Sequence, residues 1–166
     1  MDRPLPFLAL ALGLLGLIPF IATGLACLLL VGEDETRALV ALIAYGGVIL
    51  AFLGGVHWGF ALDAGRPAVP EGAPQIRAER LRLALGVLPS LVGWAAIMLP
   101  LVVAPSLSLV VLILGFIGTT AVEARARRAG LMPRGYMGLR WLLSTIVVLV
   151  LIVVLLHRLL GGRIIF

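Results

Sequence analysis

His57 is the residue in this chain whose type and surroundings are best suited to chemistry. It lies in a long apolar run beside Trp58, and it is one of two histidines in 166 residues. An imidazole in such a run can donate a hydrogen bond to another helix, bind a metal or cofactor, or serve in a proton relay or substrate contact. Its own run offers no second metal ligand. We expect a neutral, hydrogen-bonded His57, and the ligand and relay roles stay open as alternatives.

Two groups elsewhere in the chain are suitable partners for His57. Pro19 lacks an N–H and therefore leaves a backbone carbonyl in the preceding turn without its helical donor. Ser90 offers a hydroxyl within another apolar run. The aromatic candidates for polar or functional contacts are Tyr45, Trp58 and Trp94. We expect Trp94 to pack in the core, and Tyr45 and Trp58 to lie in the core or at the membrane interface.

Four charged residues flank the apolar runs and suggest a second kind of polar site. Asp63 and Glu123 are predicted at C-terminal helix ends, and Arg82 and Arg140 at N-terminal ends, so each charge opposes its own helix dipole. The two acids and the two arginines nevertheless complement each other. We predict an ion-pair layer near one membrane face. The alternative is that the arginines only set topology and the acids are solvated.

The chain contains no familiar catalytic arrangement. It has no nucleophile–base–acid set, phosphate-binding loop, HExxH motif or pair of carboxylates within an apolar run. A single cysteine excludes an internal disulfide and any site built from several cysteines. We therefore expect a protein that is not an enzyme, with no catalytic residue, no metal site and no assigned cofactor.

The elements that must position these residues follow from composition. Apolar residues make up 62% of the chain and charged residues 13%, and the mean hydropathy is +1.19. These values exclude a soluble enzyme, a disordered chain and a membrane β-barrel, whose strands alternate in polarity. We predict one all-α domain over residues 1–166, a bundle of about five transmembrane helices. The predicted spans are residues 5–31, kinked at Pro19, and residues 38–62, 83–103, 107–122 and 141–160.

Small residues recur every four positions in the second predicted span. Such a stripe lets helix backbones approach closely. His57 would lie about 200° around the helix from Gly55, so this span is expected to pack on both sides and to sit centrally. The predicted packing residues are Gly47, Ala51, Gly55 and Gly59.

The arginines predict the orientation. Ten fall on the side of the N-terminus and of the second and fourth loops, and three fall on the other side. Because arginine accumulates on the cytoplasmic side of a membrane, we expect a cytoplasmic N-terminus. The same rule explains the net charge of +5 without a nucleic-acid partner.

Four segments resemble a known family. They are residues 16–20, residues 45–59, residues 88–91 with Trp94, and residues 133–140, in which Gly135 stands where the family often carries Trp. Together they resemble small integral membrane proteins related to human transmembrane protein 69, a family of unknown function in bacteria and mitochondria. The resemblance implies a five-span inner-membrane protein and no particular reaction.

These observations favour a non-enzymatic accessory, assembly or stabilising subunit of an inner-membrane complex, respiratory or photosynthetic. Its expected partners are the lipid bilayer and another membrane protein subunit. Its expected location is the bacterial inner membrane, or the mitochondrial inner membrane in a eukaryote. One alternative is a small transporter or channel-like protein with His57 in a polar pathway. Another is a membrane protein that contacts haem or quinone.

Overall fold

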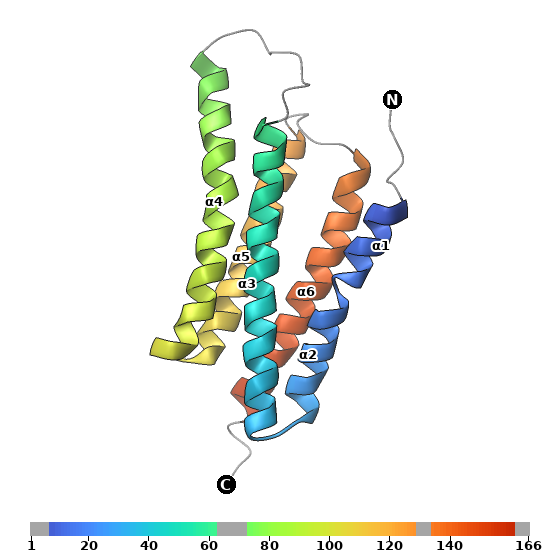
Figure 1. Cartoon of the computed structure of the whole chain (residues 1–166), viewed down its shortest axis with the longest axis vertical. Coiled ribbons are helices and arrows are strands. Elements are labelled where there is room, and N and C mark those ends of the chain that lie inside the picture. Colours follow the sequence, from blue (N-terminus) through green and yellow to red (C-terminus); the bar gives the residue numbers. More distant parts are fainter. Residues whose placement is uncertain (1–6, 63–72, 129–133, 162–166) are drawn as a thin grey trace.

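The protein is a bundle of antiparallel helices (Figure 1). The computed structural model describes residues 7–62, 73–128 and 134–161, and no strand occurs within these ranges. This confirms the predicted all-α polytopic membrane fold. The helices are α1 (Phe7–Leu15), α2 (Ile18–Leu29), α3 (Glu33–Leu62), α4 (Ala73–Val102), α5 (Pro105–Arg128) and α6 (Arg134–Gly161).

The helices pass up and down the bundle, with α1 and α2 together forming the first pass (Figure 1). In the described part of the chain, four stretches are long and apolar enough to cross a membrane. They are Leu10–Leu29, Glu33–Val56, Pro105–Arg125 and Gly138–Gly161. The apolar part of α4 is shorter and covers Gly86–Val102.

Helix α3 is the central element, as its sequence predicted. It contacts α2, α4 and α5, and its contact with α4 is the most extensive in the bundle. Helix α6 packs against α5, α2 and α1. We call the end where α1, α4 and α6 begin the arginine-rich end (Figure 1).

The predicted kink in the first span is a complete break. Helix α1 ends at Leu15 and α2 begins at Ile18, with Pro19 in the first turn of α2. Proline supplies no N–H to the helix before it, and the N–H of Leu17 turns to the carbonyl of Leu14 instead. The Tyr45 hydroxyl donates a 2.9 Å hydrogen bond to the carbonyl oxygen of Gly16. A side chain from α3 thus satisfies a backbone group at the break.

Helices α3 to α6 are longer than the predicted spans. Helix α3 begins at Glu33 rather than at residue 38, α4 at Ala73 rather than at 83, and α6 at Arg134 rather than at 141, while α5 continues to Arg128. Hydropathy marks only the part of a helix inside the hydrocarbon, whereas arginine, glutamate and alanine continue a helix beyond it.

These longer helices correct the argument from helix dipoles. Glu123 lies more than one turn before the end of α5, and Arg82 and Arg140 lie more than one turn inside α4 and α6. The dipole acts mainly on the first and last turns. The prediction that these three charges stand at helix ends was therefore wrong, and Asp63 lies outside the described residues.

The core gathers around α3, α5 and α6. The ring of Phe20 meets Tyr45 edge-on at a centroid distance of 5.0 Å and Phe116 at 6.0 Å, so the aromatic cluster ties α2 to α3 and α5. Around it lie the buried aliphatic residues Leu39, Leu42, Ile43, Leu50, Leu109, Leu112, Leu151 and Val154.

Candidate functional site

The backbones of α3 and α4 approach each other closely at two glycine pairs. The first pair is Gly47 and Gly93. A methyl group added to Gly93 would lie 2.5 Å from the carbonyl oxygen of Gly47, and one added to Gly47 would lie 2.7 Å from Ile97 Cδ1 and 2.9 Å from the Gly93 oxygen. Only glycine at both positions permits this approach.

The second pair is Gly54 and Gly86. A methyl group on Gly54 would overlap the carbonyl oxygen of Gly86, and one on Gly86 would overlap the Trp58 ring. The indole of Trp58 therefore lies over Gly86, which gives Trp58 a packing role. The two pairs are seven residues apart on each helix, so together they form one seam, which we call the glycine seam.

The predicted stripe lies on α3, the helix that carries one side of the glycine seam, but it includes only one of the two α3 glycines in that seam. Gly47 belongs to the glycine seam, but Gly55 is exposed, and no atom of the described residues lies within 4 Å of an added Cβ there. The described residues supply no packing partner at Gly55, so the predicted contact there stays a prediction. Steps of four residues rotate by about 40° each, which carries Gly55 about 80° away from Gly47, whereas Gly54 lies about 20° away. Ala51 is half-buried, and the surroundings of Gly59 lie outside the description.

A buried ion pair joins α5 and α6 near the arginine-rich end. Arg140 Nε lies 2.8 Å from Glu123 Oε2, with side chains 6% and 1% exposed. The structure thus brings together two of the four residues predicted for an ion-pair layer. The side chain of Arg82, like Asp63, falls outside what the structure describes. Burial to this depth makes the Glu123–Arg140 pair a specific interhelical contact rather than a solvated surface feature.

One helical turn deeper, two hydroxyls continue the polar contact between α5 and α6. Thr120 Oγ1 lies 2.8 Å from the carbonyl oxygen of Phe116 and 3.1 Å from Ser144 Oγ. Sequence reasoning missed both residues. The spacing in the sequence could have indicated them. Thr120 precedes Glu123 by three residues and Ser144 follows Arg140 by four, so each lies on the same helix face as its charged neighbour.

A second interhelical ion pair stands at the opposite end of the bundle. Arg158 Nη1 lies 2.5 Å from Glu35 Oε1, and both side chains are about one quarter exposed. Glu35 is in the first turn of α3 and Arg158 in the last turn of α6, where helix dipoles favour these charges. The sequence separation of the partners hid this contact from sequence reasoning.

The remaining candidates are dispersed. Tyr45 is part-buried, and its hydroxyl donates a hydrogen bond to the Gly16 carbonyl. We expected His57 to donate such a bond to a backbone carbonyl near the proline break. His57 lies on α3, but its side chain is outside the description. Ser90 is half-buried on α4. Trp94 is 62% exposed, so its assignment to the core was wrong.

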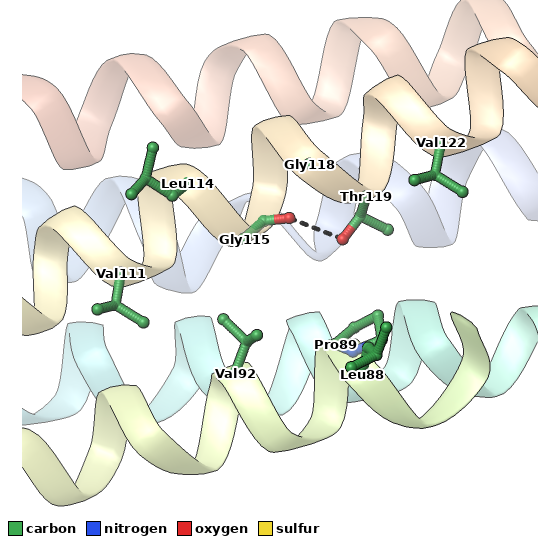
Figure 2. A pocket seen from close by; sticks show the side chains of 9 residues that line it. All are labelled: Leu88, Pro89, Val92, Val111, Leu114, Gly115, Gly118, Thr119 and Val122. Atoms are coloured by element: carbon green, nitrogen blue, oxygen red, sulfur yellow. Dashed lines mark hydrogen bonds between the residues drawn. The ribbon is translucent and has the colours of Figure 1, made fainter. Parts of the chain in front are cut away.

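Hollows lie between several of the described helices. A groove of about 360 Å³ runs along the outer face between α4 and α5 (Figure 2). A second groove of about 430 Å³ lies between α5 and α6 and includes Trp141 and Thr145. A smaller cavity of about 140 Å³ lies among α1, α2, α3, α5 and α6 and includes Arg140 and Ser144.

The comparison with known families identifies the chain. Residues 5–156 match the family described as "Protein of unknown function (DUF3429)". The chain belongs to this family. It is 39% identical over 97 residues to Transmembrane protein 69 of Xenopus tropicalis, and 39% identical over 98 residues to Transmembrane protein 69 of Mus musculus. No solved structure matches it.

These matches cover only about a third of the length of the two relatives. The aligned part covers 58% and 59% of this chain, but only 34% and 36% of the frog and mouse proteins. The matches confirm the resemblance to the transmembrane protein 69 family and identify an integral membrane protein. They carry no reaction from these relatives to this DUF3429 protein.

Described polar side chains take part in hydrogen bonds and ion pairs within the bundle. Among the residues that the structure describes, no group of three or more His, Cys, Asp or Glu side chains is placed to hold a metal ion. Several of the described polar side chains bond between helices, as in Glu123–Arg140, Thr120–Ser144 and Glu35–Arg158.

Proposed function

We propose that this DUF3429 protein is a non-enzymatic accessory subunit that stabilises or helps to assemble a larger complex, respiratory or photosynthetic, in an inner membrane. One observation carries the proposal, the groove between α4 and α5. Its lining is apolar or small throughout and consists of Leu88, Pro89, Val92, Val111, Leu114, Gly115, Gly118, Thr119 and Val122.

The floor of this groove exposes backbone of α5. Gly118 is exposed, with no atom of the described residues within 4 Å of an added Cβ. Gly115 precedes it by one turn, and Thr119 bonds back to the Gly115 carbonyl at 2.7 Å (Figure 2). The groove therefore presents small residues without an unsatisfied hydroxyl. Small residues at a helix surface are what transmembrane helices use to approach one another.

A transmembrane helix of another subunit fits the groove better than a polar substrate does. Aliphatic side chains line the groove from both helices, with Val92 on α4 and Val111 on α5, and the two glycines follow Val111 along α5 (Figure 2). This is the relief that a ridge of side chains on a partner helix fills. None of the described residues that line the groove is charged, which argues against an ion or polar-solute path there.

Orientation is part of the proposal. We place the arginine-rich end in the cytoplasm, or in the matrix of a mitochondrion, because positive charge is retained on that side. The partner subunit then meets the α4–α5 groove from within the bilayer.

The test is a leucine at Gly118, compared with a leucine at Gly55. Both glycines are exposed on membrane helices and have open space at Cβ, so both variants should accumulate as folded protein. After mild extraction from the native membrane, native mass spectrometry should show a defined heteromeric complex with wild type and with Gly55→Leu. Gly118→Leu should abolish the complex.

A photo-crosslinking residue gives an independent measurement. Placed at Leu114, which is 63% exposed beside the groove, it should join the chain to one partner protein. Placed at Leu156 on α6, away from the groove, it should not. Crosslinks at Leu114 to lipid alone, with an intact complex in Gly118→Leu, would contradict the proposed function.

A further inference from the structure

Arg140 has hydrogen-bond donors that the described protein does not use. Its Nε donates to Glu123, but its Nη2 is buried and has no hydrogen-bond partner. The side chain is 6% exposed. A guanidinium has five N–H donors and no acceptor, and leaving donors of a charged group unsatisfied in a buried place is costly.

The same side chain lines the cavity of about 140 Å³ beneath the break between α1 and α2. An engineered cavity of about 150 Å³ in another protein, lined by Leu, Ile and Phe, holds one benzene ring. The walls here suit such a ring, because they include Phe20, Phe52 and Phe116. Gly13 and Gly16 complete the wall beside the proline break without side chains of their own.

The few polar side chains of the cavity indicate which class of molecule it can bind. Arg140 and Ser144 are the lining residues with polar side chains, and Ser144 already shares a hydrogen bond with Thr120. Bound water requires two to four polar partners, which this lining offers poorly. An anion would meet the carboxylate of Glu123, whose Oε2 lies 2.8 Å from Arg140 Nε. A neutral acceptor on an apolar body suits a cavity lined by the Arg140 side chain and by three phenylalanine rings.

We propose that this cavity binds a neutral, lipid-soluble molecule through a carbonyl oxygen that accepts a hydrogen bond from Arg140. The class includes single-ring ketones and quinones, and also the ester carbonyl of a lipid, which presents the same acceptor. This binding site goes beyond the accessory role and stands independently of the α4–α5 groove.

The test uses the full chain in nanodiscs of ether-linked phosphatidylcholine, whose lipids carry no carbonyl. The probes are acetophenone, labelled with ¹³C at its carbonyl, and ethylbenzene, which has a similar shape and no acceptor. We expect acetophenone to bind at least about tenfold more tightly, equivalent to about 1.4 kcal/mol. Its carbonyl resonance should move downfield relative to empty nanodiscs.

Two variants locate the interaction. Glu123→Met with Arg140→Met replaces the pair by apolar chains of similar length, which avoids a buried unpaired charge. It should bind both probes equally and abolish the downfield shift. Leu53→Trp fills the cavity and should abolish binding of both probes, whereas Leu142→Trp on the exposed face of α6 should leave both affinities unchanged.

The comparison of acetophenone with ethylbenzene in the wild-type protein tests the proposal even if a variant fails to fold. Equal affinities for the two probes, no measurable binding, or an unshifted carbonyl resonance would overturn the proposal. Retention of the acetophenone preference in the Met–Met double variant would do the same. A drop in acetophenone affinity on changing to ester-linked lipid would identify the lipid carbonyl as the occupant, whereas an unchanged affinity would identify a diffusible ketone or quinone.

Discussion

Gly93→Ala is the substitution that the glycine seam makes most informative. The added methyl group would stand 2.5 Å from the carbonyl oxygen of Gly47 and 3.2 Å from its Cα. Both obstacles are backbone atoms, so no side chain can rotate away. The α3 and α4 helices must move apart for the variant to fold.

The magnitude follows from that displacement. Non-bonded heavy atoms are most favourably placed about 3.5–4.0 Å apart, so relief requires a shift on the order of 1 Å. A gap of about 0.5–1 Å forfeits a quarter to a half of the attraction at each contact that it opens. The α3–α4 contact is the most extensive of the bundle and includes the Gly54–Gly86 approach. We expect a loss of about 1–3 kcal/mol in the free energy of unfolding, as for other overpacked cores.

The control is Gly118→Ala, which has open space at Cβ. Both variants exchange glycine for alanine within a helix, so their difference isolates the contact with Gly47. The single cysteine is a natural reporter, because Cys27 is 1% exposed and becomes reactive only when the bundle opens. Labelling by a thiol-reactive fluorophore during a denaturant titration measures each midpoint.

The comparison has a clear refuting result. If Gly93→Ala unfolds at the same denaturant concentration as Gly118→Ala, or at a higher one, α3 and α4 do not meet at the glycine seam. The reasoning on this contact would then be wrong.

Four further predictions use the same labelling assay or a topology reporter. Arg140→Met should cost about 3–5 kcal/mol by removing a buried partner of Glu123, whereas Glu123→Met with Arg140→Met should cost less than that single change. Tyr45→Phe should cost about 0.5–1.5 kcal/mol, since it removes the hydrogen bond to the Gly16 carbonyl. Gly32→Ala should cost about 1–2 kcal/mol, because Gly32 has φ of 68° in the tight turn between α2 and α3. A reporter active only in the cytoplasm should work at the N-terminus and an export-dependent one at the C-terminus; two signals from one side would contradict an odd number of crossings.

The sequence alone determined the class of the protein and the position of its first helix break. A bilayer rewards apolar side chains and requires every backbone group to be bonded within a helix, so long apolar runs predict helices directly. Pro19 acts locally, through its missing N–H, and its effect is visible without any knowledge of neighbours. Helix ends were less well predicted, because residues such as Arg134 and Glu33 lie outside the apolar runs and still continue a helix.

Only the tertiary structure decided which residues meet. A run with many small residues contains several stripes, and the choice of Gly54 over Gly55 depends on how α4 lies along α3, which is a property of two helices and not of one. The pairing of Glu123 with Arg140, and of Tyr45 with Gly16, likewise depends on distances between segments that are separate in sequence. Hydropathy registers each of these residues by itself and carries no information on which residue of another helix it meets. The packing of the helices turns them into specific contacts, because a buried donor or charge is stable only where an acceptor from another helix lies within reach.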